Sequence, residues 1–155
     1  MFQVGGKVPY NDIVGNVGNN VILPCTPPAS VPLPLIQWYK EGRPVNISGD
    51  TRQSLVNHQH LLLENLGPEH AGLYTCHATN HLTAETVVNP QSINLTILSE
   101  TELHKPRLLM EPRPEYHPIA GDNISIPCSA SGAPKPTILW EHEAFNSLPV
   151  SCTKI

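Results

Sequence analysis

The residues of this 155-residue chain that could do chemistry are its eight histidines and four cysteines. His58 and His60 form a His-x-His pair, which on a strand would place two imidazoles on one face. A zinc site needs further cysteine, histidine or carboxylate ligands at suitable spacing, and the sequence completes no such set. It also contains no Gly-x-Ser-x-Gly, phosphate-binding loop or His-Glu-x-x-His motif, because His142-Glu143 has no second histidine after it. We therefore expect no metal, no cofactor and no enzymatic activity.

The composition excludes several further classes of protein. Charged residues make up 14% of the chain and the formal net charge is −4, so a coiled coil, a charge-rich disordered tail and a basic nucleic-acid-binding protein are all excluded. No apolar run approaches the ~20 residues that span a bilayer, and we expect no membrane contact by this segment. Proline is abundant, with 17 residues. These features favour a proline-punctuated globular protein.

An internal repeat organises the chain. Residues 18–25, GNNVILPC, resemble residues 121–128, GDNISIPC, and each stretch leads to a proline-rich heptad that ends in tryptophan, at Trp38 or Trp140. The offset is 103 residues at the cysteines (25 to 128) and 102 at the tryptophans (38 to 140). A period this long is typical of tandem copies of one small domain, because solenoid repeats are much shorter.

The first copy has the pattern of an all-β sandwich. Apolar residues alternate with other residues over 21–25, 36–38, 61–63 and 93–97, so each run has one inward face. Clusters of Gly, Pro, Asn and Asp separate these runs at the spacing expected of short strands. Helix is predicted only as a turn near residues 68–70.

Three residues give the most specific signal, namely Cys25, Trp38 and Cys76, with Tyr74 two residues before the second cysteine. This constellation resembles the immunoglobulin superfamily, and the string from Tyr74 to Asn80 is similar to its I-set. The resemblance implies a β-sandwich in which a Cys25–Cys76 disulfide joins the two sheets, Trp38 packs on it, and Tyr74 hydrogen-bonds to the preceding corner. The alternative is a pair of buried free thiols in a cytosolic domain.

One position departs from the family pattern. Immunoglobulin domains of this kind usually place an aspartate four residues before the corner tyrosine and pair it with an arginine. Here that position is His70, and Arg52 is the candidate partner. A neutral histidine offers no such ion pair, so the sequence predicts a weaker corner.

Three sequons predict N-glycosylation, at Asn46, Asn94 and Asn123. Asn94 lies between the inward residues Ile93 and Leu95, and Asn123 precedes the inward Ile124, so both side chains are predicted to face solvent. Asn46 falls in a predicted loop. The alternative is that these sequons occur by chance and carry no glycan.

The predicted domains are an immunoglobulin-like domain at 1–98, a linker at 99–107, and the N-terminal half of a second such domain at 108–155. Trp140 is the core tryptophan of this second copy, whose Tyr-x-Cys strand falls beyond residue 155. Cys128 and Cys152 are therefore predicted to be unpaired, and the apolar residues of the half-domain to be exposed. Residues 1–7 lack the apolar core of a secretory signal. We expect leader and anchor to lie outside this chain, and the intact protein to be extracellular or at the cell surface.

The repeat units resemble the second and third immunoglobulin domains of neuroglian-, neurofascin- and contactin-type neural adhesion molecules, through residues 25–28, 32–34, 74–80, 105–109 and 128–138. The resemblance implies adhesion by β-sheet surfaces to other cell-surface proteins, homophilically or heterophilically, and domains that fold back on each other. An alternative resemblance, through residues 36–41 and 92–97, is to interleukin-1-receptor-type ectodomains, which usually carry a cysteine where this chain has Gly42. A third possibility is a non-productive truncated product.

Overall fold

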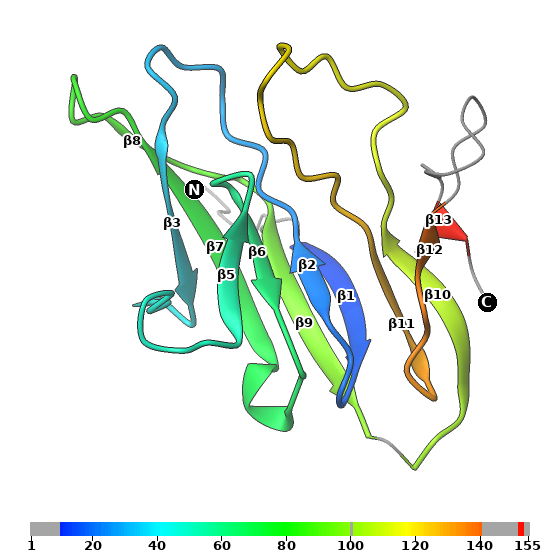
Figure 1. The fold of residues 1–155 in the computed structure, drawn as a ribbon. Helices are drawn as coiled ribbons and strands as arrows, with labels where there is room; N and C mark the ends of the chain where they lie inside the picture. Colours follow the sequence, from blue (N-terminus) through cyan, green and yellow to red (C-terminus); the bar gives the residue numbers. More distant parts are fainter. Residues whose placement is uncertain (1–9, 100, 141–151, 154–155) are drawn as a thin grey trace, which may run out of the picture.

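Two β-sheets form the first part of the protein in the computed structural model, which describes residues 10–99, 101–140 and 152–153 (Figure 1). The six-stranded sheet has the order β1-β9-β7-β3-β4, and β8 also pairs with β7. Its strands are β1 (Tyr10–Asn16), β3 (Leu35–Lys40), β4 (Arg43–Pro44), β7 (Gly72–Thr79), β8 (Thr86–Val88) and β9 (Ser92–Leu98). The three-stranded sheet has the order β2-β6-β5, with β2 (Val21–Leu23), β5 (Gln53–Val56) and β6 (His60–Leu63).

The predicted alternation of apolar residues is what builds the core between these sheets. Trp38 is fully buried and lies opposite Cys76 in the antiparallel β3–β7 ladder. Leu61 and Leu63 of β6 face it from the other sheet, within one buried cluster. The predicted fold class, an immunoglobulin-like β-sandwich, is confirmed. The one described helical element is η1 (Pro68–His70), a short 3-10 turn where the sequence predicts a turn.

A disulfide between Cys25 and Cys76 connects the two sheets. Cys25 follows β2 of the three-stranded sheet, and Cys76 lies within β7 of the six-stranded sheet, so the disulfide spans the sandwich. Both half-cystines and Trp38 belong to the same buried cluster. The structure thus contains the bridged arrangement and not the pair of free thiols.

The second repeat is organised differently from a sandwich within the described residues. β10 (His104–Met110) pairs with β11 (Ser129–Ala133), and β12 (Leu139–Trp140) pairs with β13 (Cys152–Thr153). Residues 122–128 form no strand, because no described neighbour supplies a ladder for them, and Ile124 is 46% exposed. Trp140, the predicted core tryptophan of this copy, is only partly buried.

Two sequence-based predictions about this region need correction. Because His104 and Arg107 already pair with β11, β10 occupies the last four residues of the predicted linker, and the connection from β9 is correspondingly short. Cys128 is disulfide-bonded, so the prediction that it is unpaired is wrong. The side chain of Cys152, the other predicted unpaired cysteine, lies outside the described residues.

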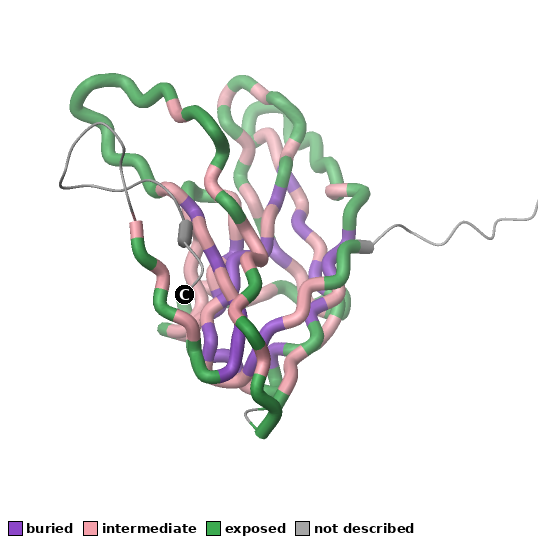
Figure 2. The backbone as a smooth tube through the Cα atoms, turned by 90° about the vertical axis from the view of Figure 1, so that its right-hand side faces the viewer, coloured by how far each residue is buried: buried purple, intermediate pink, exposed green. Residues whose placement is uncertain are grey.

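Strand β11 packs against β1 and β2 of the first sandwich, beside which it lies in Figure 1. The buried positions of the chain lie in the interior of the molecule, as Figure 2 shows. Asn19 makes a reciprocal contact with the backbone of Gly132: its Nδ2 donates to the carbonyl at 3.0 Å, and its Oδ1 accepts from the N–H at 3.3 Å. The Ser131 hydroxyl donates to Asn16 Oδ1 at 2.7 Å. All of these groups are buried, so the two repeats meet through a specific polar junction.

Replacing Asn19 with alanine is expected to open this junction. The substitution leaves the Gly132 N–H and carbonyl buried without a partner, at a cost of about 1–3 kcal/mol for each group. Gly132 should then exchange its amide hydrogen faster, and small-angle X-ray scattering should show a larger radius of gyration. Asn11→Ala, which changes an exposed amide, is the matched control. An unchanged Gly132 exchange rate in Asn19→Ala would contradict the prediction.

Candidate recognition surface

The outer face of the six-stranded sheet follows directly from strand alternation. Since Trp38, Cys76 and Ala78 point inward, their neighbours along β3 and β7 point outward. The registers place these outward residues in two rows across the sheet. The upper row is Leu35, Thr79 and Thr86, the lower row is Gln37, His77 and Val88, and Tyr39 and Thr75 continue the face below them.

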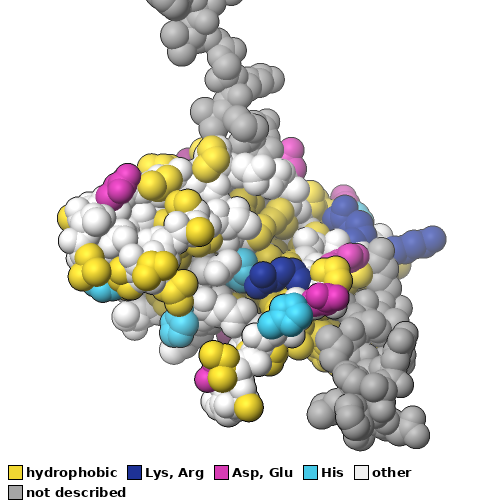
Figure 3. Space-filling view, turned by 90° about the horizontal axis from the view of Figure 1, so that it is seen from above, with side chains coloured by type: hydrophobic (Ala, Val, Ile, Leu, Met, Phe, Trp, Pro, Cys, Tyr) yellow, Lys and Arg dark blue, Asp and Glu magenta, His cyan; other side chains and the backbone are white. Residues whose placement is uncertain are grey.

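Over β3, β7 and β8 this outer face combines aromatic, aliphatic, amide and hydroxyl side chains, and none of these eight residues is Lys, Arg, Asp or Glu. The same face carries a carboxylate farther across the sheet, at Asp12 of β1, which pairs with Asn94 of β9. The Tyr39 and His77 rings pack with their centroids 4.2 Å apart. Leu35 is 63% exposed and Val88 is 52% exposed. Figure 3, seen from above, shows hydrophobic and uncharged polar side chains over the left-hand side of the molecule, with an acidic side chain among them, while the Lys and Arg side chains lie elsewhere. The face therefore has the character of the core of a protein interface, where charged residues are depleted.

The three predicted glycosylation residues lie at different places. Asn94 is partly buried in β9 on the same outer face, and its Nδ2 donates to Asp12 Oδ1 at 2.8 Å. Asn46 is exposed, and its Oδ1 accepts from the Gly49 N–H. Asn123 is exposed outside any strand. Asn94 is thus the sequon at the border of the uncharged face.

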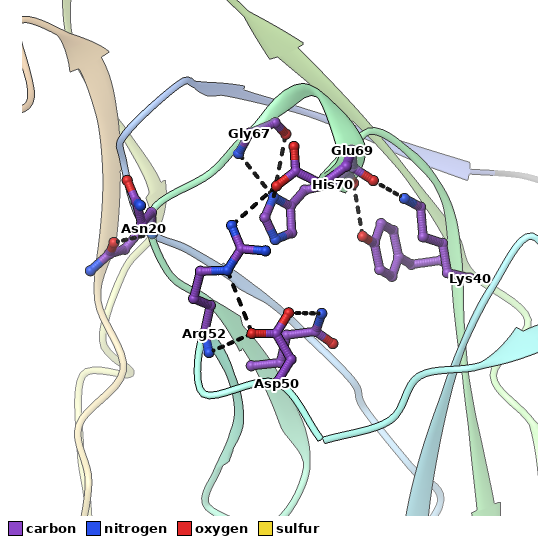
Figure 4. Close-up of polar contacts among 10 residues, drawn as sticks. Asn20, Lys40, Asp50, Arg52, Gly67, Glu69 and His70 are labelled. Carbon is purple, nitrogen blue, oxygen red and sulfur yellow. Dashed lines mark hydrogen bonds and ion pairs between the residues drawn. The ribbon is translucent and has the colours of Figure 1, made fainter. Parts of the chain in front are cut away.

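The corner before β7 is built around Tyr74 and Arg52 (Figure 4). The Tyr74 hydroxyl donates to the His70 carbonyl at 2.8 Å, as the tyrosine-corner resemblance implies. Arg52 has an ion-pair partner after all, because Glu69 lies beside position 70 and places Oε1 3.1 Å from the guanidinium. The Arg52 backbone N–H, together with its guanidinium, lowers the pKa of the Asp50 carboxyl below its ordinary value. The corner thus contains an ion pair, although position 70 takes no part in the pairing of Arg52.

His70 caps the turn and supplies no carboxylate to Arg52. Its ring is buried, only 3% exposed, and Nδ1 accepts a hydrogen bond from the Gly67 N–H at 2.9 Å. Nδ1 also lies 3.3 Å from the Gly67 carbonyl oxygen and 3.5 Å from Glu69 Oε1. Nε2 is buried and has no hydrogen-bond partner among the described residues.

Raising the pH should weaken this corner through Tyr74. Burial, with a smaller contribution from the Glu41 carboxylate, raises the pKa of Tyr74 to about 12, against about 10 in an unfolded chain. Because the folded pKa is the higher one, this stabilisation is complete below pH 10 and is lost as the pH rises from 10 to 12. We expect a loss of about 1–2 kcal/mol between pH 9 and pH 11.5, since pH 11.5 still lies below the folded pKa. Denaturant unfolding at pH 9 and 11.5 measures it.

Tyr74→Phe is the control for this pH dependence. The variant lacks the hydroxyl bond to His70, so it should be less stable at pH 7 but should lose less further stability at high pH. The other three tyrosines are unchanged in the comparison. A variant whose stability falls as steeply as that of the wild type between pH 9 and 11.5 would contradict the assignment.

The two histidines of the His-x-His pair lie in different local structures. His58 lies in a turn with a positive φ of 57°, whereas His60 begins β6. The His60 Nδ1 accepts from the Cys25 N–H at 3.1 Å, and burial lowers the pKa of His60. The ring of His60 thus has a structural partner next to the disulfide.

Comparison with known proteins decides the family. Residues 7–80 match the family described as immunoglobulin domain. The chain belongs to the immunoglobulin superfamily. The cell adhesion molecule DSCAM of Rattus norvegicus is 33% identical over 136 residues, which cover 86% of this chain and 6% of DSCAM. The neuronal-glial cell adhesion molecule of Gallus gallus is 32% identical over 129 residues, covering 79% of this chain and 10% of that protein.

Solved structures agree with this immunoglobulin fold. A structure described as the structural basis for Dscam isoform specificity superposes with a TM-score of 0.66, covering 94% of this chain and 39% of that one at 20% identity. The tandem immunoglobulin repeats of Dlar give a TM-score of 0.51 at 30% identity, covering 57% and 44%. The chain spans a tenth or less of the length of the two curated adhesion molecules, so it corresponds to one small region of such proteins.

Several functional features of this immunoglobulin-superfamily chain carry no signal in the sequence. Glu69 is an ordinary surface glutamate until the fold places it beside Arg52. Asn16 and Asn19 contact residues more than 100 positions away.

Within the described residues, no helix is long and apolar enough to cross a membrane.

Proposed function

We propose that this chain is an extracellular recognition module of a cell adhesion molecule, and that it binds protein partners through the outer face of its six-stranded sheet. The observation that carries the proposal is the uncharged face that includes Leu35, Tyr39, His77 and Val88. Burying these eight residues desolvates no charged side chain, so removing water from them costs less free energy than removing it from a charged surface. The similarity to DSCAM and to the neuronal-glial cell adhesion molecule supports an adhesion-type module.

The disulfide supports the extracellular part of this proposal. Disulfides persist in oxidising compartments and are rare in the reducing cytosol. The Cys25–Cys76 bridge lies in the buried core, so an oxidising compartment would preserve its contribution to stability. Glycans on Asn46, Asn94 and Asn123 belong to the same proposal, and a glycan on Asn94 would border the uncharged face. Secreted protein should lose mass on enzymatic removal of N-glycans, and an unchanged mass would exclude glycosylation.

The sheet-face proposal is tested by placing a charge on the face. Fluorescent beads coated with the chain are mixed with one another and with beads that carry ectodomains of its adhesion relatives. We expect aggregation or mixed binding with the wild-type chain, and its loss with Val88→Lys, which buries an unpaired ammonium in the contact. Thr101→Lys adds the same charge at an exposed position between β9 and β10 and should leave binding unchanged. Wild-type beads that bind nothing, or Val88→Lys beads that bind normally, would refute the proposal.

A further inference from the structure

Two loops at one end of the first sandwich expose large apolar side chains to water. One loop, residues 26–34, leads into β3, and the other, residues 80–85, connects β7 to β8; both lie in the upper left of Figure 1. Val31 is 96% exposed and Leu33 is 84% exposed in the first loop, and Leu82 is 75% exposed in the second. We call the surface formed by these two loops the loop end.

Hydrogen bonds join the two loops and fix their shape. Asn80 Nδ2 donates to the Ser30 hydroxyl at 3.0 Å, which connects the second loop to the first. Asn80 Oδ1 accepts from the Leu82 N–H at 2.9 Å and from the Thr83 N–H at 3.3 Å, so the same side chain closes the turn that presents Leu82. Ordered loops lose little conformational entropy when they bind a partner. Apolar residues gathered on one ordered surface, unlike single scattered ones, indicate an interaction site.

Glu85 is the only Asp, Glu, Lys or Arg residue in the two loops. The Thr79 and Thr86 hydroxyls bond to each other on the outer face of the sheet. Asn80 and Glu85, joined by a hydrogen bond from the Asn80 N–H to the Glu85 carbonyl, form the next pair of the hairpin and point to the opposite side. The bond from Asn80 to Ser30 indicates that this side faces the first loop. Glu85 is exposed and takes part in none of the ion pairs between described residues.

We propose that the loop end binds a segment of a protein partner that presents apolar side chains next to a lysine or arginine. The apolar side chains pack on Val31, Leu33 and Leu82, and the lysine or arginine pairs with the Glu85 carboxylate. Lipid phosphates would meet no Lys or Arg in either loop, which favours a cationic protein segment over a membrane surface. Glu85 and the outward-facing Thr86 point to opposite sides of the hairpin, so the loop end and the sheet face are testable separately.

Titration by nuclear magnetic resonance tests the loop end on the full, disulfide-bonded chain. The probe is the capped tripeptide leucine-lysine-leucine, and the capped tripeptide leucine-glutamate-leucine is its matched control. We expect saturable shifts of the Leu33, Leu82 and Glu85 amide resonances at millimolar concentrations of the lysine peptide, and about tenfold weaker binding of the glutamate peptide. Equal affinities for the two peptides, or no saturable shift, would overturn the proposal. Phosphatidylcholine vesicles that broaden the same resonances would assign the loop end to a lipid surface and overturn it too.

Glu85→Gln isolates the role of the charge. Glu85 is exposed, so its substitution should leave the fold intact. We expect binding of the lysine peptide to weaken about threefold and binding of the glutamate peptide to strengthen about threefold, so that the preference for lysine disappears. Glu102→Gln removes the same charge at an exposed position between β9 and β10 and should keep the tenfold preference. A Glu85→Gln chain that still prefers the lysine peptide would refute the proposed pairing.

Leu82→Ser isolates the apolar contact. Since Leu82 is exposed, its replacement should not disturb the core, but it should weaken binding of both peptides about fivefold. Leu103→Ser is the matched control, because Leu103 is 85% exposed and lies between β9 and β10, outside the loop end. A Leu82→Ser chain with wild-type affinity for the lysine peptide would show that the apolar side chains take no part in binding, contrary to the proposal.

Discussion

Replacing Cys25 and Cys76 together with alanine is expected to lower the free energy of unfolding by about 4 kcal/mol. The disulfide closes a segment with a sequence separation of 51, and the chain-entropy account relates stabilisation to the length of the closed loop. Because a small domain has only about 5–15 kcal/mol of total stability, the loss would bring the sandwich close to unfolding at physiological temperature.

Denaturant unfolding of the wild-type chain and the double variant measures this effect. The double variant is followed with and without reductant, which separates loss of Cys25–Cys76 from reduction of the disulfide at Cys128. The large shift should already be present in the variant without reductant. A double variant as stable as the wild type would show that the buried contacts alone hold the two sheets together.

Trp38→Ala should have a comparable effect, a loss of about 3–5 kcal/mol. The side chain is fully buried, so its removal leaves a cavity at the centre of the core. Its Nε1 also donates to the Gln59 carbonyl at 2.9 Å, and that acceptor loses its partner. Both consequences act on the contact between the sheets.

The repeat offers a matched control for this variant, namely Trp140→Ala. Trp140 occupies the corresponding sequence position but is only partly buried, so its replacement should cost far less. Urea unfolding followed by circular dichroism compares the two variants. Equal losses of unfolding free energy would mean that both tryptophans stabilise the protein to the same extent, contrary to their difference in burial.

The first sandwich is predictable from sequence because its signals are local. A period of two places Val21, Leu23 and Cys25 on one face whatever their partners are, and the spacing of Cys25, Trp38 and Cys76 limits the choice of fold. The tyrosine corner is also local, because Tyr74 bonds to His70 only four positions away. These features require no knowledge of distant contacts.

The junction between the two repeats was not predictable for the opposite reason. Asn19 packs against Gly132, which lies 113 positions away in the sequence. No periodic pattern of residues predicts such a contact. Residues 122–128 repeat the pattern of residues 19–25 yet form no strand, since a strand also needs a neighbour with which to pair. The ion pair between Arg52 and Glu69 was not predictable either, because it joins residues 17 positions apart that only the fold brings together.

The parallel pairing of β1 with β9 sets how the sandwich responds to tension. A pull at the start of β1 and at the end of β9 acts in opposite directions along two strands held in register from Tyr10↔Ser92 to Asn16↔Leu98. The ladder is then loaded in shear, so its hydrogen bonds resist together and do not open one at a time. If the β1–β9 ladder breaks, the disulfide still prevents the chain between its cysteines from extending. This segment of 51 positions would be about 170 Å long when extended. Between two adhering cells, such a module would be a stiff tether with little slack to release.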